Sequence, residues 1–251
     1  MTDNAWEKFA AEEPYWAVLT DERYKASNAP LAADVQREFF HTGEQHIERV
    51  TRVLSRHFGR RFTPQDCCLD FGSGVGRLLL PMARRCGRAI GIDVSRTMRR
   101  LCMDHAVQKR SGNVECYEAV SDPALAETGL DWVNSYIVFQ HIETRKGFEI
   151  LENLLSKINK NGAISIHFTV FKDRTLMNYV TNKMKYFRVD EFGVSDLQTN
   201  YPFYDSDVMM MNDYDVNKIY MLLAEYGFHS VITEHENQGG MHGLLFYSIK
   251  E

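Results

Sequence analysis

The chain has 251 residues, 44% of them hydrophobic and 25% charged, and a formal net charge of −5 at pH 7. We expect one α/β domain with an appendage, because this length suits a single sizeable core. The charge lacks the basic excess of a dedicated nucleic-acid binder, and no apolar run approaches the roughly 20 residues that span a bilayer. We therefore expect no nucleic-acid partner, no membrane partner and, because the N-terminal residues lack a signal-peptide pattern, a cytoplasmic protein.

Helical and strand patterns alternate as far as residue 170. Residues 1–62 predict a helical cap with helices at 34–40 and 43–58, and Pro64 breaks the chain before a strand at 67–71. The next predicted elements are a helix at 77–85, a strand at 89–93, a helix from Ser95 to Lys109, a strand at 114–117, a short helix started by Asp122 and Pro123, a strand at 132–139, a helix at 144–158, a turn at Asn161 and Gly162, and a strand at 163–170. Strands separated by such helices indicate βαβ units and a mostly parallel sheet.

The alternation stops at residue 171. Residues 171–213 are rich in aromatic side chains and are interrupted by Gly193 and Pro202. A helix at 215–226 follows, and then two strands at 230–235 and 243–249 around the sequence NQGG. This last pair predicts an antiparallel hairpin at the end of the parallel sheet.

Three glycines, Gly72, Gly74 and Gly76, occupy alternate positions in CLDFGSGVGR, directly after the first predicted strand. Glycine permits positive φ and lets a ligand or another backbone approach where a Cβ would collide. Between a buried strand and a helix, such a loop leaves backbone amides facing a ligand. The pattern favours a nucleotide or cofactor cradle, although strand-to-helix loops also use glycine for structural reasons alone.

An acidic residue, Asp93, ends the second predicted strand. Dinucleotide- and adenosine-binding folds place at this point, about twenty residues after the glycine loop, the carboxylate that accepts hydrogen bonds from ribose hydroxyls. The alternative is an exposed residue that starts the next helix beside Ser95. Taken together, the loop and the acid favour a bound nucleoside.

Two cofactor classes fit a nucleoside site. A nicotinamide site is typical of GxGxxG, whereas the spacing here is GxGxG with Asp70 two residues before the first glycine. A carboxylate at that position would repel a pyrophosphate, whereas S-adenosylmethionine carries a sulfonium and an ammonium and no phosphate. The electrostatics favour S-adenosylmethionine.

The series LDFGSGVGRL, GIDVS, DWVNSYIVFQHI and NGAISIHF resembles the ordered motifs of the class I S-adenosylmethionine-dependent methyltransferases over roughly residues 65–170. The resemblance implies a Rossmann-like, doubly wound α/β fold with a seven-stranded sheet, mostly parallel with an antiparallel C-terminal hairpin strand. It also implies one methyltransferase domain over residues 1–251, made of the helical cap at 1–62, a cofactor-binding core at 63–170, an acceptor-side insertion at 171–213, and a C-terminal helix and hairpin at 214–251.

The resemblance implies site residues as well. It places Gly72, Ser73 and Gly74 beside the methionine moiety, Asp93 on the ribose and Val94 against the adenine. The full set of expected cofactor contacts is Asp70, Phe71, Gly72, Ser73, Gly74, Gly76, Asp93, Val94, Asp122, Tyr136 and Gln140. Asp122 is assigned to the adenine because Ala119 and Val120 are neither acidic nor amides, and it is equally suited to cap the short helix before Pro123.

Gln140 and His141 are expected to line the opening to the methyl acceptor. His141 is the expected general base, because it follows a central strand at the edge where open α/β sheets bind ligands. A histidine there could instead cap the strand or contact the cofactor. His167 fits a position in the core, and His41 and His46 fit the surface of a helix. The aromatic side chains of residues 171–213 either roof the acceptor cavity or pack the appendage onto the sheet.

We therefore expect transfer of a methyl group from S-adenosylmethionine to an oxygen or nitrogen of a small-molecule acceptor, either a metabolite or a sugar-like compound. We expect no metal, because Asp131 opens its strand at the end away from the site and the five cysteines form no CxxC pair. We interpret these cysteines as reduced and buried: Cys67, Cys68, Cys86, Cys102 and Cys116. The alternatives are a nicotinamide-dependent oxidoreductase and a non-catalytic nucleoside-binding protein.

Overall fold

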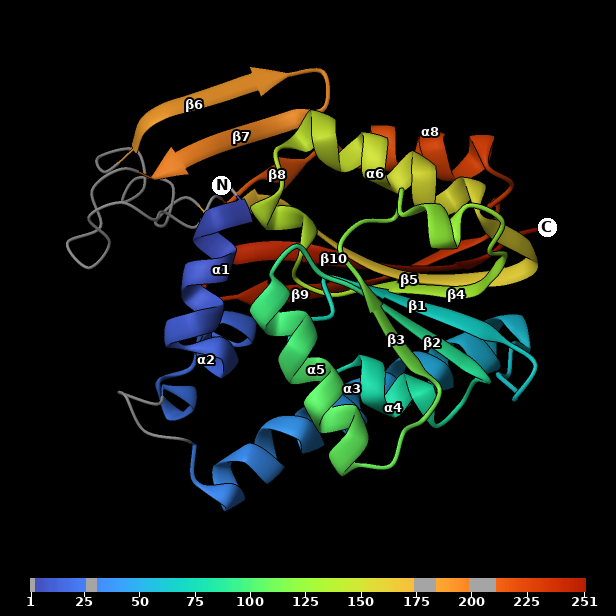
Figure 1. Ribbon diagram of the computed structural model, residues 1–251. Coiled ribbons are helices and arrows are strands. Elements are labelled where there is room, and N and C mark those ends of the chain that lie inside the picture. The colour runs from blue at the N-terminus through green and yellow to red at the C-terminus, as the bar shows by residue number, and fades with distance from the viewer. Residues whose placement is uncertain (1–2, 26–30, 174–183, 199–210) are drawn as a thin grey trace. The chain divides into compact units, whose positions relative to one another are not determined.

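A seven-stranded sheet organises the computed structural model, which describes residues 3–25, 31–173, 184–198 and 211–251. Its strands are β1 (Cys67–Phe71), β2 (Arg88–Ile92), β3 (Val114–Tyr117), β4 (Leu130–Ser135), β5 (Ile158–Lys172), β9 (Val231–Gln238) and β10 (Met241–Ile249). The order is β3-β2-β1-β4-β5-β10-β9 (Figure 1). Strands β1 to β4 pair in parallel, and β10 is antiparallel to both β5 and β9. The expected Rossmann-like sheet with an antiparallel C-terminal hairpin is confirmed.

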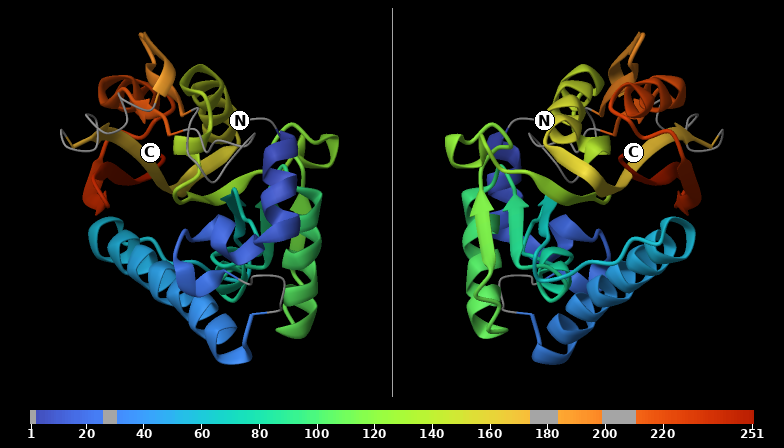
Figure 2. Two further views of the ribbon diagram at one scale, coloured as in Figure 1. Left: turned by 90° about the vertical axis from the view of Figure 1, so that its left-hand side faces the viewer. Right: turned by 90° about the vertical axis from the view of Figure 1, so that its right-hand side faces the viewer.

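The chain consists of two compact units, Thr2–Asn134 and Ser135–Glu251. The helices of the first unit are α1 (Asp3–Glu12), α2 (Pro14–Val18), α3 (Ala33–Phe58), α4 (Leu79–Ala83) and α5 (Arg96–Gln108), with short 3-10 turns η1 (Glu22–Tyr24) and η2 (Pro123–Leu125). Four of the five residues in each of β1 and β2 are buried, as expected for parallel strands inside an α/β fold. Helix α4 contacts both strands, α5 contacts β3, and α3 packs against α4 (Figure 2).

Helix α3 is one continuous helix where the sequence predicted two. Gly43 lies in its interior, where an added Cβ would stand 2.1 Å from the carbonyl oxygen of Arg77. The glycine therefore allows a close approach of the helix to that backbone, and burial of Ile47, Val50 and Leu54 on the same helix outweighs its low helix propensity.

The second unit contains η3 (Phe139–His141), α6 (Thr144–Ser156), α8 (Val216–Glu225) and a separate sheet, β6-β7-β8, formed by β6 (Met184–Asp190), β7 (Gly193–Gln198) and β8 (Asp213–Tyr214). The sequence did not predict this second sheet. Aromatic side chains of Phe139, Phe168, Tyr214 and Phe246 pack together in the unit. A buried ion pair, Lys172 to Asp213 at 2.8 Å, joins β5 to β8.

Two expectations in this unit are wrong. The predicted strand at 132–139 ends at Ser135, because Ile137 adopts a φ of +56° and Phe139 starts η3. The predicted turn at Asn161 and Gly162 lies inside β5, where the amide of Asn161 donates to Lys250 and the carbonyl of Gly162 accepts from it. Asn161 keeps the left-handed φ of +64° that suits such a turn, yet pairing with the distant C-terminal residues places it within the strand.

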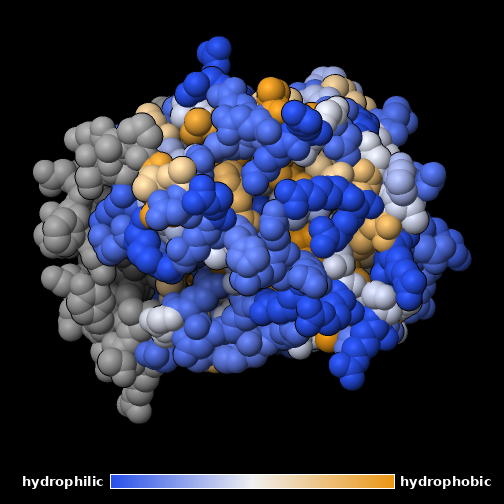
Figure 3. Space-filling model, turned by 90° about the horizontal axis from the view of Figure 1, so that it is seen from below, coloured by the Kyte–Doolittle hydropathy of each residue, from blue (hydrophilic) through white to orange (hydrophobic). Residues whose placement is uncertain are grey.

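Part of the predicted insertion lies outside the described residues, namely 174–183 and 199–210, which include the aromatic residues Tyr179, Tyr201, Phe203 and Tyr204. Hydrophilic side chains predominate on the face that Figure 3 shows, with small apolar areas between them. Within the described ranges, no helix combines the length and apolar character that crossing a membrane requires.

Candidate active site

The glycine loop follows β1 in a geometry that glycine adopts at low cost. The φ angles of Gly72, Gly74 and Gly76 are +77°, +51° and +89°, in the left-handed region. The amides of Gly72 and Ser73 both donate to the carbonyl oxygen of Ile92, at 2.8 and 2.9 Å. These bonds fold the loop back over the end of β2.

Asp93 lies directly after β2 and joins this strand to the glycine loop. Its Oδ2 accepts a hydrogen bond from the amide of Gly74 at 2.9 Å, and its Oδ1 accepts one from the amide of Ser95 at 2.9 Å. Burial raises the pKa of Asp93 to about 6, although the two amide bonds lower it. The structure thus brings together two separately predicted features, and the carboxylate keeps further lone pairs for a ligand's hydroxyl groups.

Asp70 is a second buried carboxyl group, located on β1. It is the register partner of Asn134 on β4, whose Nδ2 donates to its Oδ1 at 2.8 Å. Burial raises the pKa of Asp70 to about 7, against the lowering effects of Asn134 and Arg77, and charge repulsion from Asp93 raises it further. Two acidic groups beside one loop suit a cationic ligand and disfavour a pyrophosphate.

Arg99 holds the segment after β2. Its Nη1 donates to the carbonyl oxygens of Asp93 at 2.6 Å and Val94 at 3.1 Å, and its Nη2 donates to Glu118 at 3.0 Å. The side chain of Val94 is 41% exposed, so a planar ring can pack against it. Glu118 directly follows β3, and the sequence reasoning missed it because it considered only Ala119 and the residues beyond.

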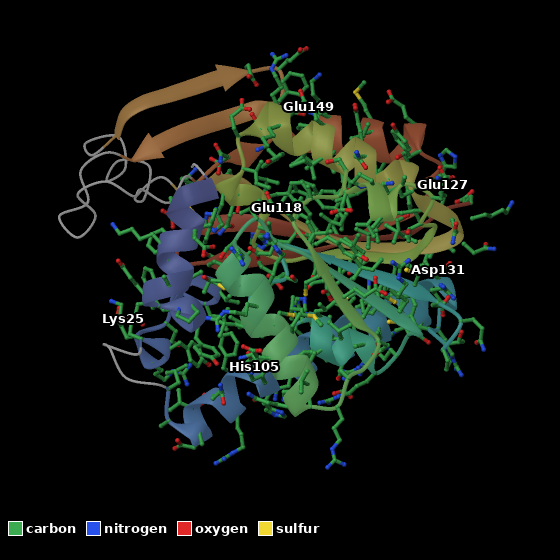
Figure 4. The ribbon with its side chains drawn as sticks, in the orientation of Figure 1. Lys25, His105, Glu118, Glu127, Asp131 and Glu149 are labelled. Atoms are coloured by element: carbon green, nitrogen blue, oxygen red, sulfur yellow. The ribbon has the colours of Figure 1, made fainter. Side chains whose placement is uncertain are left out.

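Two further acidic positions, Asp122 and Asp131, were considered from the sequence. Asp122 caps η2, since its Oδ1 accepts a hydrogen bond from the amide of Ala124 at 2.9 Å. Asp131 lies near the start of β4, whereas Glu118 follows the end of β3, so they stand at opposite ends of the parallel strands (Figure 4). There Asp131 accepts a hydrogen bond from the amide of Cys67 at 2.8 Å. The described part of the chain contains no group of three or more side chains suited to hold a metal ion.

The N-terminal segment contacts the glycine loop and the start of α5. Glu7 on α1 accepts hydrogen bonds from Ser95 Oγ at 2.7 Å and from the hydroxyl and amide of Thr97, and these bonds lower its pKa to about 2. Val18 on α2 lies so close to Gly74 that an added Cβ there would stand 2.7 Å from its Cγ2. Sequence reasoning missed both residues, because no local pattern signals a contact across 88 positions.

Residues predicted to follow β4 belong to the second unit. The hydroxyl of Tyr136 donates to Glu236 at 2.7 Å, and its ring packs edge-on against His167 at 5.3 Å. Ile137 has a left-handed φ of +56°, which is rare for a β-branched residue and marks a strained turn. His167 is buried within β5, at a core position of the kind that its sequence pattern indicates.

Gln140 is buried, and its side chain orients His141. Its Oε1 accepts a hydrogen bond from Thr169 Oγ1 at 2.7 Å, and its Nε2 lies 3.2 Å from Nε2 of His141. Its backbone oxygen accepts two bonds from Asn212. Because an amide nitrogen only donates, Nε2 of His141 is the acceptor, and the neutral imidazole carries its proton on Nδ1.

The remaining predicted positions also lie near the loop or on helices. Phe71 ends β1 and is buried, and Gly76 faces Cys102, whose Sγ would stand 2.8 Å from an added Cβ. His41 is exposed on α3, and His46 on the same helix is half-buried. Among the sequence-predicted residues, the first unit therefore gathers the glycine loop, Asp70, Asp93 and Val94, and the second gathers those after β4.

Comparison with known proteins finds matches to part of the chain. Residues 68–162 match a family described as a methyltransferase domain. An uncharacterized methyltransferase of Alkaliphilus oremlandii is 28% identical over 146 residues, which make up 57% of this chain and 64% of the relative. The match thus spans less than two thirds of that relative's length.

Solved structures share the fold. Magnesium protoporphyrin IX methyltransferase from Synechocystis PCC 6803, solved with bound S-adenosylhomocysteine, aligns over 99% of both chains with a TM-score of 0.62 and 14% identity. The 1,6-didemethyltoxoflavin-N1-methyltransferase of Burkholderia thailandensis aligns over 90% of this chain and 94% of its own, with a TM-score of 0.55 and 17% identity. Residues 68–162 thus match a methyltransferase domain, and the chain shares the fold of solved methyltransferases, of which the Synechocystis enzyme was also solved with bound S-adenosylmethionine.

The residues around the glycine loop fit this cofactor. The buried Oγ of Ser73 has no hydrogen-bond partner among the described residues, so a ligand atom can satisfy it. Asp93 retains acceptor capacity for hydroxyl groups, and the acidic Asp70 and Asp93 suit a cofactor that carries positive charge and no phosphate.

Proposed function

We propose that the protein transfers a methyl group from S-adenosylmethionine to an oxygen or nitrogen of a small-molecule acceptor. The observation that carries the proposal is the hydrogen bond from the amide of Gly74 to the carboxylate of Asp93, which couples the glycine loop to the acid after β2. The two solved relatives, named for magnesium protoporphyrin IX and 1,6-didemethyltoxoflavin, support an acceptor of small-molecule size.

The residues that we propose to contact the cofactor here all belong to the first unit. Gly72, Ser73 and Gly74 hold the methionine moiety, Asp93 accepts hydrogen bonds from the ribose hydroxyls, and Val94 packs against the adenine. Asp70 stabilises the positive charge of the bound cofactor from its buried position on β1. When bound, S-adenosylmethionine supplies a methyl group on a positively charged sulfur.

His141 acts as the general base in this proposal. After the hydrogen bond from Gln140 opens, the freed lone pair of Nε2 takes the proton from the acceptor's oxygen or nitrogen while that atom bonds to the methyl carbon and the carbon–sulfur bond breaks, which leaves S-adenosylhomocysteine. Thr169 donates to Gln140, and Gln140 donates to Nε2 of His141, so these two bonds orient the imidazole before the acceptor binds. A positioned base of this kind contributes about 10² to 10⁴-fold to the rate.

The donor half is tested by calorimetric titration with S-adenosylhomocysteine and, separately, with NADH. We expect the wild type to bind S-adenosylhomocysteine and not NADH. Asp93→Ala should lose this binding, whereas the matched control Asp104→Ala, which removes an exposed carboxylate of α5, should retain it. Binding of NADH alone would favour the oxidoreductase alternative, and binding of neither compound would contradict the donor site.

The base is tested with His141→Ala once a screen of small molecules has found an acceptor. We expect a turnover number lowered about 10² to 10⁴-fold, with unchanged affinity for S-adenosylhomocysteine. Unchanged turnover would exclude His141 as the base while leaving the methyltransferase proposal intact.

A further inference from the structure

A basic groove lies in the first unit, apart from the glycine loop. Its volume is about 370 Å³, and its lining consists of Glu48, Thr51, Arg52, Ser55, Arg60, Arg61, Phe62 and Arg85. None of the residues assigned to the cofactor is among them. Four arginines face one glutamate here, in a chain whose formal net charge is −5.

Contacts within the chain support one wall of the groove. Gly59 ends α3 with a φ of +69°, and the chain turns so that Arg60 Nη2 donates to the buried Asp66 at 2.6 Å. The Arg60 guanidinium also lies 4.8 Å above the ring of Phe62, which stacks on the buried Trp132 at 4.4 Å. These contacts fix the position of the backbone that bears Arg61, so the site is preorganised on this side.

The charge of the groove is only partly compensated. Asp66 neutralises Arg60, and Glu48 lies 3.7 Å from Arg52 at an exposed position where ion pairs are weak. Among the described residues, neither Arg61 nor Arg85 has a carboxylate within salt-bridge distance, although Arg85 also donates to the carbonyl oxygen of Pro81. Two guanidinium groups therefore remain available for an anion.

The guanidinium groups of the groove favour a phosphate-bearing ligand. Guanidinium forks bind phosphate oxygens in pairs, and several arginines together favour a ligand with more than one negative charge. Both faces of Phe62 are covered, by Trp132 and by Arg60, so the groove offers no aromatic face for a base to stack on. The volume lies in the range of small-ligand sites.

We propose that this groove binds the linked phosphate groups of a small ligand, with Arg52, Arg61 and Arg85 as the phosphate-binding residues. Such groups occur in free polyphosphate and in nucleoside di- and triphosphates. The groove recognises the phosphates, which both sources share. This site is independent of the methyltransferase reaction proposed above.

The test is calorimetric titration of the full chain with sodium triphosphate and, in parallel, with ATP. We expect both to bind, and the affinity to fall at least about tenfold between about 0.01 M and 0.15 M ionic strength, since screening lengths shorten from about 30 to 8 Å. Equal affinities would assign recognition to the phosphates alone. Much tighter binding of ATP than of triphosphate would overturn that assignment.

Variants locate the site. The double variant Arg61→Gln, Arg85→Gln should weaken triphosphate binding at least about tenfold, since it removes two charge-assisted contacts. The control Arg37→Gln removes an exposed arginine from the other end of α3 and should bind like the wild type. Unchanged far-UV circular dichroism and melting temperature show that each variant is folded. No triphosphate binding at low salt, or equal losses in the control, would overturn the proposal.

Discussion

Asp93 couples the proposed cofactor site to pH. Its pKa is raised to about 6 by burial, and its ionised form is the better acceptor for ribose hydroxyls. We expect the affinity for S-adenosylhomocysteine to be constant above about pH 7 and to fall towards tenfold per pH unit below about pH 6, because a proton then competes for the carboxylate. Calorimetric titrations across this range measure the effect. Constant affinity down to about pH 5 would contradict the role of Asp93.

Asp70 makes the stability of the fold depend on pH. Its folded pKa of about 7 exceeds the ordinary value of 3.8, so the folded state retains a proton that the unfolded state has released between these values. Stability therefore falls as pH rises through this window. We expect Asp70→Asn to raise the free energy of unfolding at about pH 8 by on the order of 1 to 4 kcal/mol, and by little near pH 4. Urea denaturation at both pH values checks this, and an equal gain at both would be inconsistent with it.

Some residues of the candidate site were predictable from the sequence and others were not. Gly74 and Asp93 belong to one unit, β1–loop–α4–β2, whose spacing is set by backbone geometry, so a short motif indicates them. Glu7 and Val18 reach the same loop from the N-terminal helices, and the pairing of Thr169 with Gln140 joins two segments 29 positions apart. Such contacts depend on tertiary packing, which a local pattern does not encode.

Helices and strands also divide into those that local sequence signals predict and those that long-range packing decides. Helix α5 was predicted closely, because Ser95 gives a local start signal and its Oγ does accept from the amide of Met98 at 3.1 Å. The start of β5 and the sheet β6-β7-β8 were not predicted, because long-range strand pairing decides them. The sequence analysis placed a break between two helices near Gly43. The glycine instead lies within one helix, where it permits a close contact with the backbone of Arg77.

Gly147 makes a second close contact, between α6 and β8. An added Cβ would stand 1.9 Å from Oη and 2.7 Å from Cζ of Tyr214, whose hydroxyl donates to Ile142 at 2.9 Å. We expect Gly147→Ala to lower the free energy of unfolding by about 1 to 3 kcal/mol, since overpacking outweighs the gain in helix propensity of about 1 kcal/mol.

Urea denaturation measures this loss in the free energy of unfolding. Two further variants test whether the contact with Tyr214 causes it. The control Gly112→Ala places a Cβ where no heavy atom lies within 4 Å, so its stability should stay near that of the wild type. Adding Tyr214→Phe to Gly147→Ala removes the Oη atom and should restore part of the stability. Full stability of Gly147→Ala alone would show that Tyr214 moves aside at no cost.

At the scale of the whole molecule, charge and function are distributed unevenly. The chain is acidic overall, yet the groove at the end of α3 is basic, while the glycine loop of the same unit is bordered by Asp70 and Asp93. Opposite charges in one unit favour different ligands at its two sites. A cationic cofactor and a phosphate-bearing ligand would therefore each be excluded electrostatically from the other's site.

The proposed donor and acceptor residues also separate, since Asp93 belongs to Thr2–Asn134 and His141 to Ser135–Glu251. Saturating S-adenosylhomocysteine should raise the melting temperature of the wild type, because a ligand that binds only the folded state stabilises it by mass action. We expect the same rise in His141→Ala, which keeps every proposed cofactor contact, and no rise in Asp93→Ala. Differential scanning fluorimetry reads all three proteins in one experiment. If folded His141→Ala lost the rise, His141 would be a cofactor contact, and its loss of turnover would no longer support its role as a base.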